Sequence, residues 1–112
     1  MKIYKKERRF KVGINNIILK EVAKISLNQN EMITFVSGKT EYDIVKKNWG
    51  YYATPSINGR LKTFGFKTFI VSNSKKKIYI FLVHKNKINL FKNYIKKERN
   101  FIIKELTNFK KF

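Results

Sequence analysis

The sequence predicts an α+β fold: a single antiparallel sheet of about five strands, a meander plus a hairpin, with one C-terminal helix packed on it. Three observations lead to this expectation. Apolar and polar residues alternate in several short segments, as they do in half-buried strands. Short turns rich in Asn, Ser and Gly separate these segments. In the last quarter of the chain, the apolar residues recur at helical spacing instead.

The first three predicted strands form the meander. Apolar side chains recur at every second position of residues 17–27, with Glu21 as the exception, and two further strands are expected at residues 32–36 and 41–47. The polar turns 28–31 and 37–40 join them. Short turns between alternating segments are typical of consecutive antiparallel strands, so we expect these three strands to pair in order.

The second half supplies the hairpin and the helix. Residues 64–71 and 78–83 are apolar enough for two strands, with the polar turn 72–76 between them. The second strand is apolar on both faces, as expected where a helix covers one side of a sheet. The helical spacing covers residues 87–106. The remaining residues are expected to be frayed, with Phe109 and Phe112 as candidates for docking.

Composition limits the class of protein. A chain of 112 residues with 43% hydrophobic and 15% aromatic residues is large enough for one core, so we expect residues 1–112 to form a single small basic domain. The absence of Cys excludes disulfides, thiolate metal sites and Cys nucleophiles. A single His excludes a His-rich metal site within one chain. No metal and no other cofactor is therefore expected.

The charge balance indicates a polyanionic partner. The chain has 26 Lys and Arg against 7 Asp and Glu, a net charge of +19, which is typical of proteins that bind nucleic acid or another polyanion. An AT-rich genome raises the Lys content without any functional reason, but it also supplies Glu freely, and Glu is scarce here. Arg, the usual reader of guanine, is rare, so we expect contacts that do not depend on base sequence. The candidate polyanion contacts are Lys46, Lys47, Lys75, Lys76 and Lys77.

The sequence also indicates a location. The longest uninterrupted apolar run, residues 78–83, is too short to span a membrane. The basic N-terminal residues have no apolar segment behind them, unlike a secretory signal. A cytoplasmic location is therefore expected, while the oligomeric state is not predicted.

Residues 48–61 are expected to form a central aromatic loop that binds a ligand. This stretch contains the only Trp and the only Pro of the chain, and long loops in small domains are often functional. Its rings can stack on bases or on the apolar face of a sugar, and its guanidinium can hold a phosphate or carboxylate. The same aromatic residues could instead pack as part of the core. The candidate ligand-binding residues are Trp49, Tyr51, Tyr52, Thr54, Ser56, Asn58 and Arg60.

Asp43 and His84 are the weak candidates for catalysis. His84 closes the apolar strand, and a carboxylate beside it would orient the imidazole as a general base. Nothing in the sequence requires the two side chains to meet, and a His at a strand end is more often structural. We therefore expect a binding protein rather than an enzyme.

Three functions stay open at this point. The first is a small basic binding module for a polyanion such as nucleic acid, with little sequence preference. The second is a domain, either a binding protein or an enzyme, that takes a small molecule, glycan or nucleotide sugar, with the central loop as its pocket. The third is a protein-interaction or assembly module, indicated by an exposed apolar patch around Trp49 and Tyr51.

Overall fold

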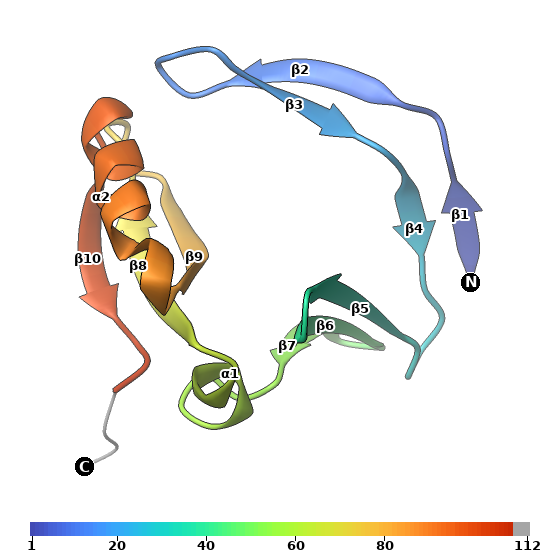
Figure 1. Cartoon of the computed structure of the whole chain (residues 1–112). Helices are drawn as coiled ribbons and strands as arrows, with labels where there is room; N and C mark the ends of the chain where they lie inside the picture. Colours follow the sequence, from blue (N-terminus) through green and yellow to red (C-terminus); the bar gives the residue numbers. More distant parts are fainter. Residues whose placement is uncertain (109–112) are drawn as a thin grey trace.

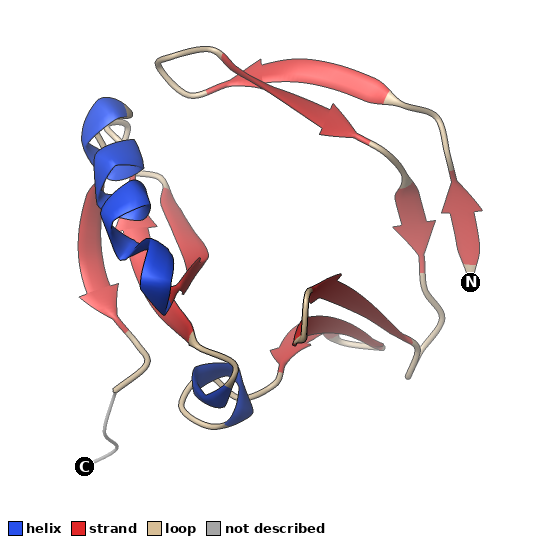
Figure 2. Cartoon of the chain, in the orientation of Figure 1, coloured by secondary structure: helices blue, strands red, loops and turns tan. Residues whose placement is uncertain are grey.

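The computed structural model describes residues 1–108, and strands dominate this part of the chain (Figures 1 and 2). Two short α-helices and one 3-10 turn accompany the strands. The strands are β1 (Lys2–Tyr4), β2 (Arg8–Val12), β3 (Ile17–Glu21), β4 (Lys24–Ser26), β5 (Met32–Ser37), β6 (Thr40–Lys47), β7 (Gly50–Thr54), β8 (Phe66–Ser72), β9 (Ile78–His84) and β10 (Phe101–Glu105). The helical segments are α1 (Arg60–Thr63), η1 (Lys85–Lys87) and α2 (Ile88–Lys97).

The predicted single sheet of about five strands is wrong. The described strands form four small antiparallel sheets, with the orders β1-β4, β2-β3, β5-β6-β7 and β10-β8-β9. The predicted meander placed residues 17–27 beside β5, whereas β3 folds back on β2 and β4 pairs with β1. Alternation within a strand shows that one face is buried, but it does not show which other strand is its partner.

Several of the individual strands are confirmed. The predicted strands at residues 32–36, 41–47, 64–71 and 78–83 correspond to β5, β6, β8 and β9. The predicted strand at residues 17–27 is two strands, β3 and β4, which residues 22–23 separate. The basic segment near the N-terminus, to which no strand was assigned, contains β2.

The predicted C-terminal helix is too long. Helix α2 ends at Lys97, and the chain then reverses at Arg99, which adopts a left-handed conformation with φ +54°. The Asn100 amide donates to the Ile95 carbonyl at 2.9 Å, which satisfies one of the free carbonyls at the helix end. The residues that follow form β10, which pairs with β8. The docking expected of Phe109 and Phe112 lies outside the described residues.

The core of the described structure lies between α2 and the sheet β10-β8-β9. Phe69 and Val71 of β8 and Val83 of β9 are buried against Phe91 and Ile95 of α2. The Phe69 and Phe91 ring centres are 5.0 Å apart. On the face opposite α2, Phe66 and Thr68 of β8 are also buried, toward the end of the strand that contacts α1, whereas Ile78 and Ile80 of β9 stay exposed.

The N-terminal strands form a long two-stranded ribbon that returns to α2. The tip of the β2-β3 hairpin lies at the C-terminal end of that helix (Figure 1). Asn15 donates to the Glu98 carboxylate twice, from its backbone amide at 3.1 Å and from its side-chain Nδ2 at 2.6 Å. Its Nδ2 also donates to the Lys97 carbonyl at 2.8 Å. These bonds connect residues more than eighty positions apart and hold the ribbon to the core.

Within residues 1–108, no helix has the length and apolar character needed to cross a membrane.

The tip of the hairpin requires glycine at position 13, which leads to a first prediction. Gly13 has φ +74°, and a Cβ there would overlap the Glu98 carboxylate. Gly38 is a matched control, because it has φ +60° but no atom within 4 Å of an added Cβ. Replacing either glycine by Ala should cost about 1–2 kcal/mol for the left-handed backbone. Gly13→Ala should in addition break the contact with Glu98.

The measurement is amide hydrogen exchange at Asn15, whose N–H donates to Glu98. Gly13→Ala should remove the protection of this amide, and Gly38→Ala should leave it unchanged. Equal exchange in the two variants would show that the Glu98 contact does not hold the ribbon.

Candidate functional site

The predicted central loop, residues 48–61, contains several kinds of structure. Asn48 and Trp49 form the turn between β6 and β7, and Tyr51, Tyr52 and Thr54 belong to β7. Ser56 and Asn58 lie in the turn that follows the cis Thr54–Pro55 peptide bond, and Arg60 begins α1. Because β7 rises about 3.3 Å per residue, Trp49 and Arg60 lie at opposite ends of a strand more than about 13 Å long. The structure therefore does not gather these residues around one pocket.

One face of the sheet β5-β6-β7 carries three aromatic rings. Tyr51 lies opposite Lys46, and Phe35 lies opposite Tyr42, so all four side chains project from the same face. We call these four residues the aromatic face. Ile44 and Ala53 lie between the two pairs and form an apolar floor.

The aromatic face is open to solvent and carries a cation. The Lys46 Nζ lies 4.8 Å from the centre of the Tyr51 ring, within the range of a cation–π contact. Tyr51 is 62% exposed and Phe35 is 55% exposed, so their flat surfaces are available to a ligand. Tyr42 is half-buried, and burial raises the pKa of its phenol. This face can therefore stack planar groups and attract an anion at the same place.

The opposite face of the same sheet carries the other two aromatic residues of the predicted loop. The Trp49 and Tyr52 rings stack at 6.3 Å between centres and 19° between planes. Trp49 is 67% exposed at the hairpin tip. Val45, which lies opposite Tyr52, is buried. The stack thus forms a second, smaller aromatic surface on the far side of the sheet from Tyr51.

The polar residues of the predicted loop have structural contacts. Thr54 lies opposite Asp43 in the sheet, and the Ser56 carbonyl accepts from the amides of Gly59 at 3.2 Å and Leu61 at 3.2 Å. The Arg60 guanidinium is exposed and lies 5.9 Å from the Phe64 ring. Asn58 is also exposed. Of these residues, Arg60 is the one whose charge is free to reach a ligand near α1.

The structure does not bring Asp43 and His84 together. Asp43 lies in the middle of β6 and His84 at the end of β9, in different sheets, and no hydrogen bond joins them. The His84 ring packs on Phe66 at 4.4 Å between centres. Asp43 is buried, and its Oδ1 has no hydrogen-bond partner among the described residues. The geometry of a carboxylate-oriented imidazole is therefore absent.

The candidate lysines form two separate groups. Lys46 and Lys47 lie at the end of β6, where Lys47 Nζ donates to Asn30 Oδ1 at 2.7 Å. Lys75, Lys76 and Lys77 lie in the turn between β8 and β9, in another sheet. Asn73 Oδ1 fixes that turn by accepting from the amides of Lys75 and Lys77, each at 2.9 Å. These two groups do not converge into one patch (Figure 1).

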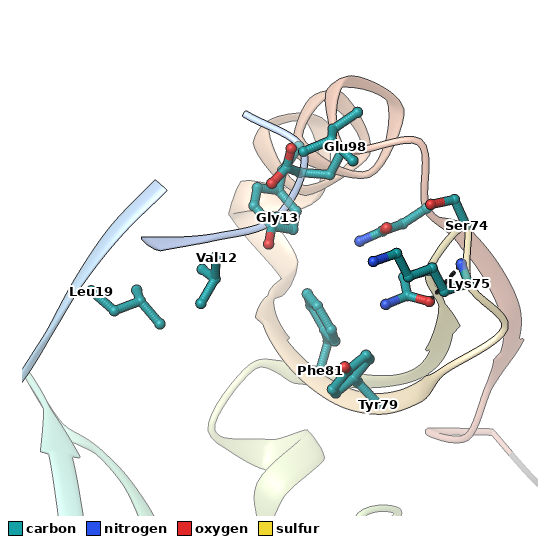
Figure 3. A pocket seen from close by; sticks show the side chains of 12 residues that line it. Val12, Gly13, Leu19, Ser74, Lys75, Tyr79, Phe81 and Glu98 are labelled. Carbon is teal, nitrogen blue, oxygen red and sulfur yellow. Dashed lines mark hydrogen bonds between the residues drawn. The ribbon is translucent and has the colours of Figure 1, made fainter. Parts of the chain in front are cut away.

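A cleft of about 590 Å³ lies where the β2-β3 hairpin meets the C-terminal core. Figure 3 shows Val12 and Leu19 on one side of it and Tyr79 and Phe81 on another. None of the residues 48–61 lines it. Sequence reasoning missed this cleft because its walls come from segments about sixty residues apart. The lining residues are Val12, Gly13, Ile14, Leu19, Asn73, Ser74, Lys75, Tyr79, Phe81, Tyr94, Glu98 and Asn100.

Sequence reasoning also missed Phe35 and Tyr42 as members of the aromatic face. Both occupy alternate positions of predicted strands, which was a usable signal. Their place beside Tyr51 depends on the register of β5, β6 and β7, which the alternation within each strand does not determine.

Among residues 1–108, no group of three or more His, Cys, Asp or Glu side chains could hold a metal ion. Comparison of the chain with protein-family models, with curated proteins and with solved structures gives no match.

The burial of Tyr42 leads to a second prediction. Burial disfavours the phenolate, so the pKa of Tyr42 lies above the ordinary tyrosine value of about 10. The neutral buried phenol therefore contributes stability that is fully present below pH ~10 and is lost as the pH rises through the raised pKa. In an alkaline titration followed by phenolate absorbance, Tyr42→Phe should remove an ionisation step above the ordinary tyrosine value. The variant Tyr51→Phe should retain this ionisation step. If the step persists in Tyr42→Phe, its assignment to Tyr42 is contradicted.

Proposed function

We propose that the aromatic face of β5-β6-β7 binds single-stranded nucleic acid with little sequence preference. The observation that carries this proposal is the exposed Tyr51 ring with the Lys46 ammonium beside it, in register with a second pair of rings on the same face. A base can stack on the ring while the ammonium attracts the adjacent phosphate. Stacking surfaces combined with cations are the usual means by which proteins bind single strands without reading sequence.

The spacing of the rings suits an extended strand. Tyr42 lies four residues from Lys46 along β6, which corresponds to about 13 Å between the two stacking positions. The apolar floor of Ile44 and Ala53 lies between them, and it can accept the bases or riboses that stack on neither ring. Sheet faces present rigid side chains, so the rings are held in place before the ligand arrives.

The charge of the chain supports a polyanion over a neutral sugar. The net charge of +19 produces a field that attracts nucleic acid from a distance. Lys is far more frequent than Arg, and Lys ammonium groups make phosphate contacts that do not distinguish between bases. A neutral glycan would use the same rings, but it would gain nothing from this charge.

The Tyr51 ring gives the third prediction. Tyr51→Ala should weaken binding of a fluorescent single-stranded oligonucleotide by roughly 5- to 150-fold, because stacking contributes about 1–3 kcal/mol per base. Tyr51→Phe should retain most of the affinity. Tyr4→Ala is the matched control, because Tyr4 is a similarly exposed tyrosine on β1, in a different sheet. Unchanged binding by Tyr51→Ala, with weaker binding by Trp49→Ala, would move the site to the opposite face of the sheet.

The Lys46 ammonium gives the fourth prediction. The dependence of log affinity on log salt concentration should be steep and negative in the wild type, since phosphate contacts release counterions. Lys46→Gln should reduce the magnitude of this slope by about one, as expected for the loss of one phosphate contact. Lys39→Gln, at the exposed β5-β6 turn, tests whether any lysine of this sheet would have the same effect. If the salt dependence is steep and neither Tyr51→Ala nor Lys46→Gln alters it, the binding comes only from diffuse attraction by the remaining lysines.

A further inference from the structure

The chain exposes far more surface than a folded monomer of its mass. Its accessible surface is 8999 Å², whereas a compact monomer of 13.4 kDa exposes about 6,500 Å². Its radius of gyration is 15.7 Å, compared with about 13 Å for a compact domain of this length. The excess of about 2,500 Å² is larger than the roughly 800 Å² that each partner buries in a standard interface. This much uncovered surface indicates that part of it is buried in an assembly.

One exposed surface is rich in apolar residues and belongs to the sheet that carries the core. It is the face of the sheet β10-β8-β9 that lies opposite α2, which we call the outer face (Figure 2). The strand register places six apolar side chains on it, of which Phe66 is buried within the chain: Phe66, Ile70, Ile78, Ile80, Leu82 and Phe101. Ile78 is 65% exposed and Ile80 is 64% exposed, although both lie on the sheet that carries the core.

The outer face is also poor in charge, unlike the rest of the chain. Strand β9 contains no charged residue over its seven positions. The exposed apolar residues of the N-terminal ribbon, such as Ile18 and Val22, alternate with or adjoin Lys and Glu. In a chain with a net charge of +19, two copies repel each other unless the contact surface excludes the cations. Lys104 of β10, which lies opposite Ile70 and beside the bulge, is the one Lys that the strand register places on the outer face.

We propose that the outer face packs against the outer face of a second copy of this chain. Two sheets would then stack about 10 Å apart, with the isoleucines interdigitated and α2 on the outside of each sheet. In a dimer with two-fold symmetry, the same face of each copy contacts the other, so the same residues form both sides of the interface. An acidic partner is less suited to it, because β9, which carries its most exposed isoleucines, has no Lys or Arg to pair with.

This interface is separate from the proposed nucleic-acid site, which lies on the sheet β5-β6-β7. The two proposals therefore fail independently. A dimer would also present two aromatic faces to one strand, which increases affinity through effective concentration.

The fifth prediction concerns the mass of the protein in solution. Light scattering after size-exclusion chromatography should give twice the 13.4 kDa chain mass for the wild type. Ile80→Lys should raise the dimer dissociation constant by more than tenfold, because it places two charges at a symmetric apolar contact. Ile18→Lys is the matched control, because Ile18 is 61% exposed on β3, and it should leave the dimer intact. A wild-type monomer, or equal effects of the two variants, would overturn the proposal.

Cross-linking tests the contact directly and does not depend on how well the charged variant folds. The natural chain has no Cys, so Ile80→Cys and Ile18→Cys each carry a single thiol. A short bis-maleimide should link two Ile80→Cys chains in high yield, since their thiols would lie near the two-fold axis. Ile18→Cys should give only the low yield of random collisions. Equal yields at the two positions would exclude the outer face as the contact.

Discussion

The packing of α2 on β8 and β9 is the contact on which the rest of the described structure depends. It buries Phe69 and Val71 of β8 against Phe91 and Ile95 of the helix. The other sheets have no comparable core, and many of their large apolar side chains are exposed. A small core of this kind contributes limited stability, so the hydrogen bonds of Asn15 that dock the N-terminal hairpin on it matter for the whole described structure.

Glu98 connects this core to the N-terminal half. It is buried beside Gly13, and its Oε2 accepts both donors of Asn15. Its Oε1 has no hydrogen-bond partner among the described residues. A buried carboxylate is costly unless its oxygens are satisfied, so the ribbon stabilises Glu98 as much as Glu98 positions the ribbon. The contact also forms one wall of the cleft, which exists only while the hairpin tip is docked.

Charge and apolar surface are divided between different sheets. The aromatic face of β5-β6-β7 combines exposed rings with Lys46, which suits a flexible polyanion. The outer face of β10-β8-β9 exposes the isoleucines of β9, a strand without Lys, Arg, Asp or Glu, which suits an apolar partner surface. If both proposals hold, one small chain associates with itself and still presents a cationic surface, because the two proposed contacts do not use the same residues.

The sequence by itself determined the positions of strands such as β5, β6, β8 and β9, since alternation and polar turns are local properties. It also indicated the excess of positive charge and marked Tyr51 and Lys46 as candidates, because composition and ring chemistry need no coordinates. It could not show that residues 101–105 leave the helical pattern, because the reversal at Arg99 and the pairing of β10 with β8 depend on a distant strand. Only the tertiary structure decided that the strands form four small sheets, that Phe35 and Tyr42 join Tyr51 on one face, and that Asp43 and His84 stay apart. The physical reason is that strand pairing is a contact between distant residues, and its register is chosen by the burial of whole faces rather than by any single segment.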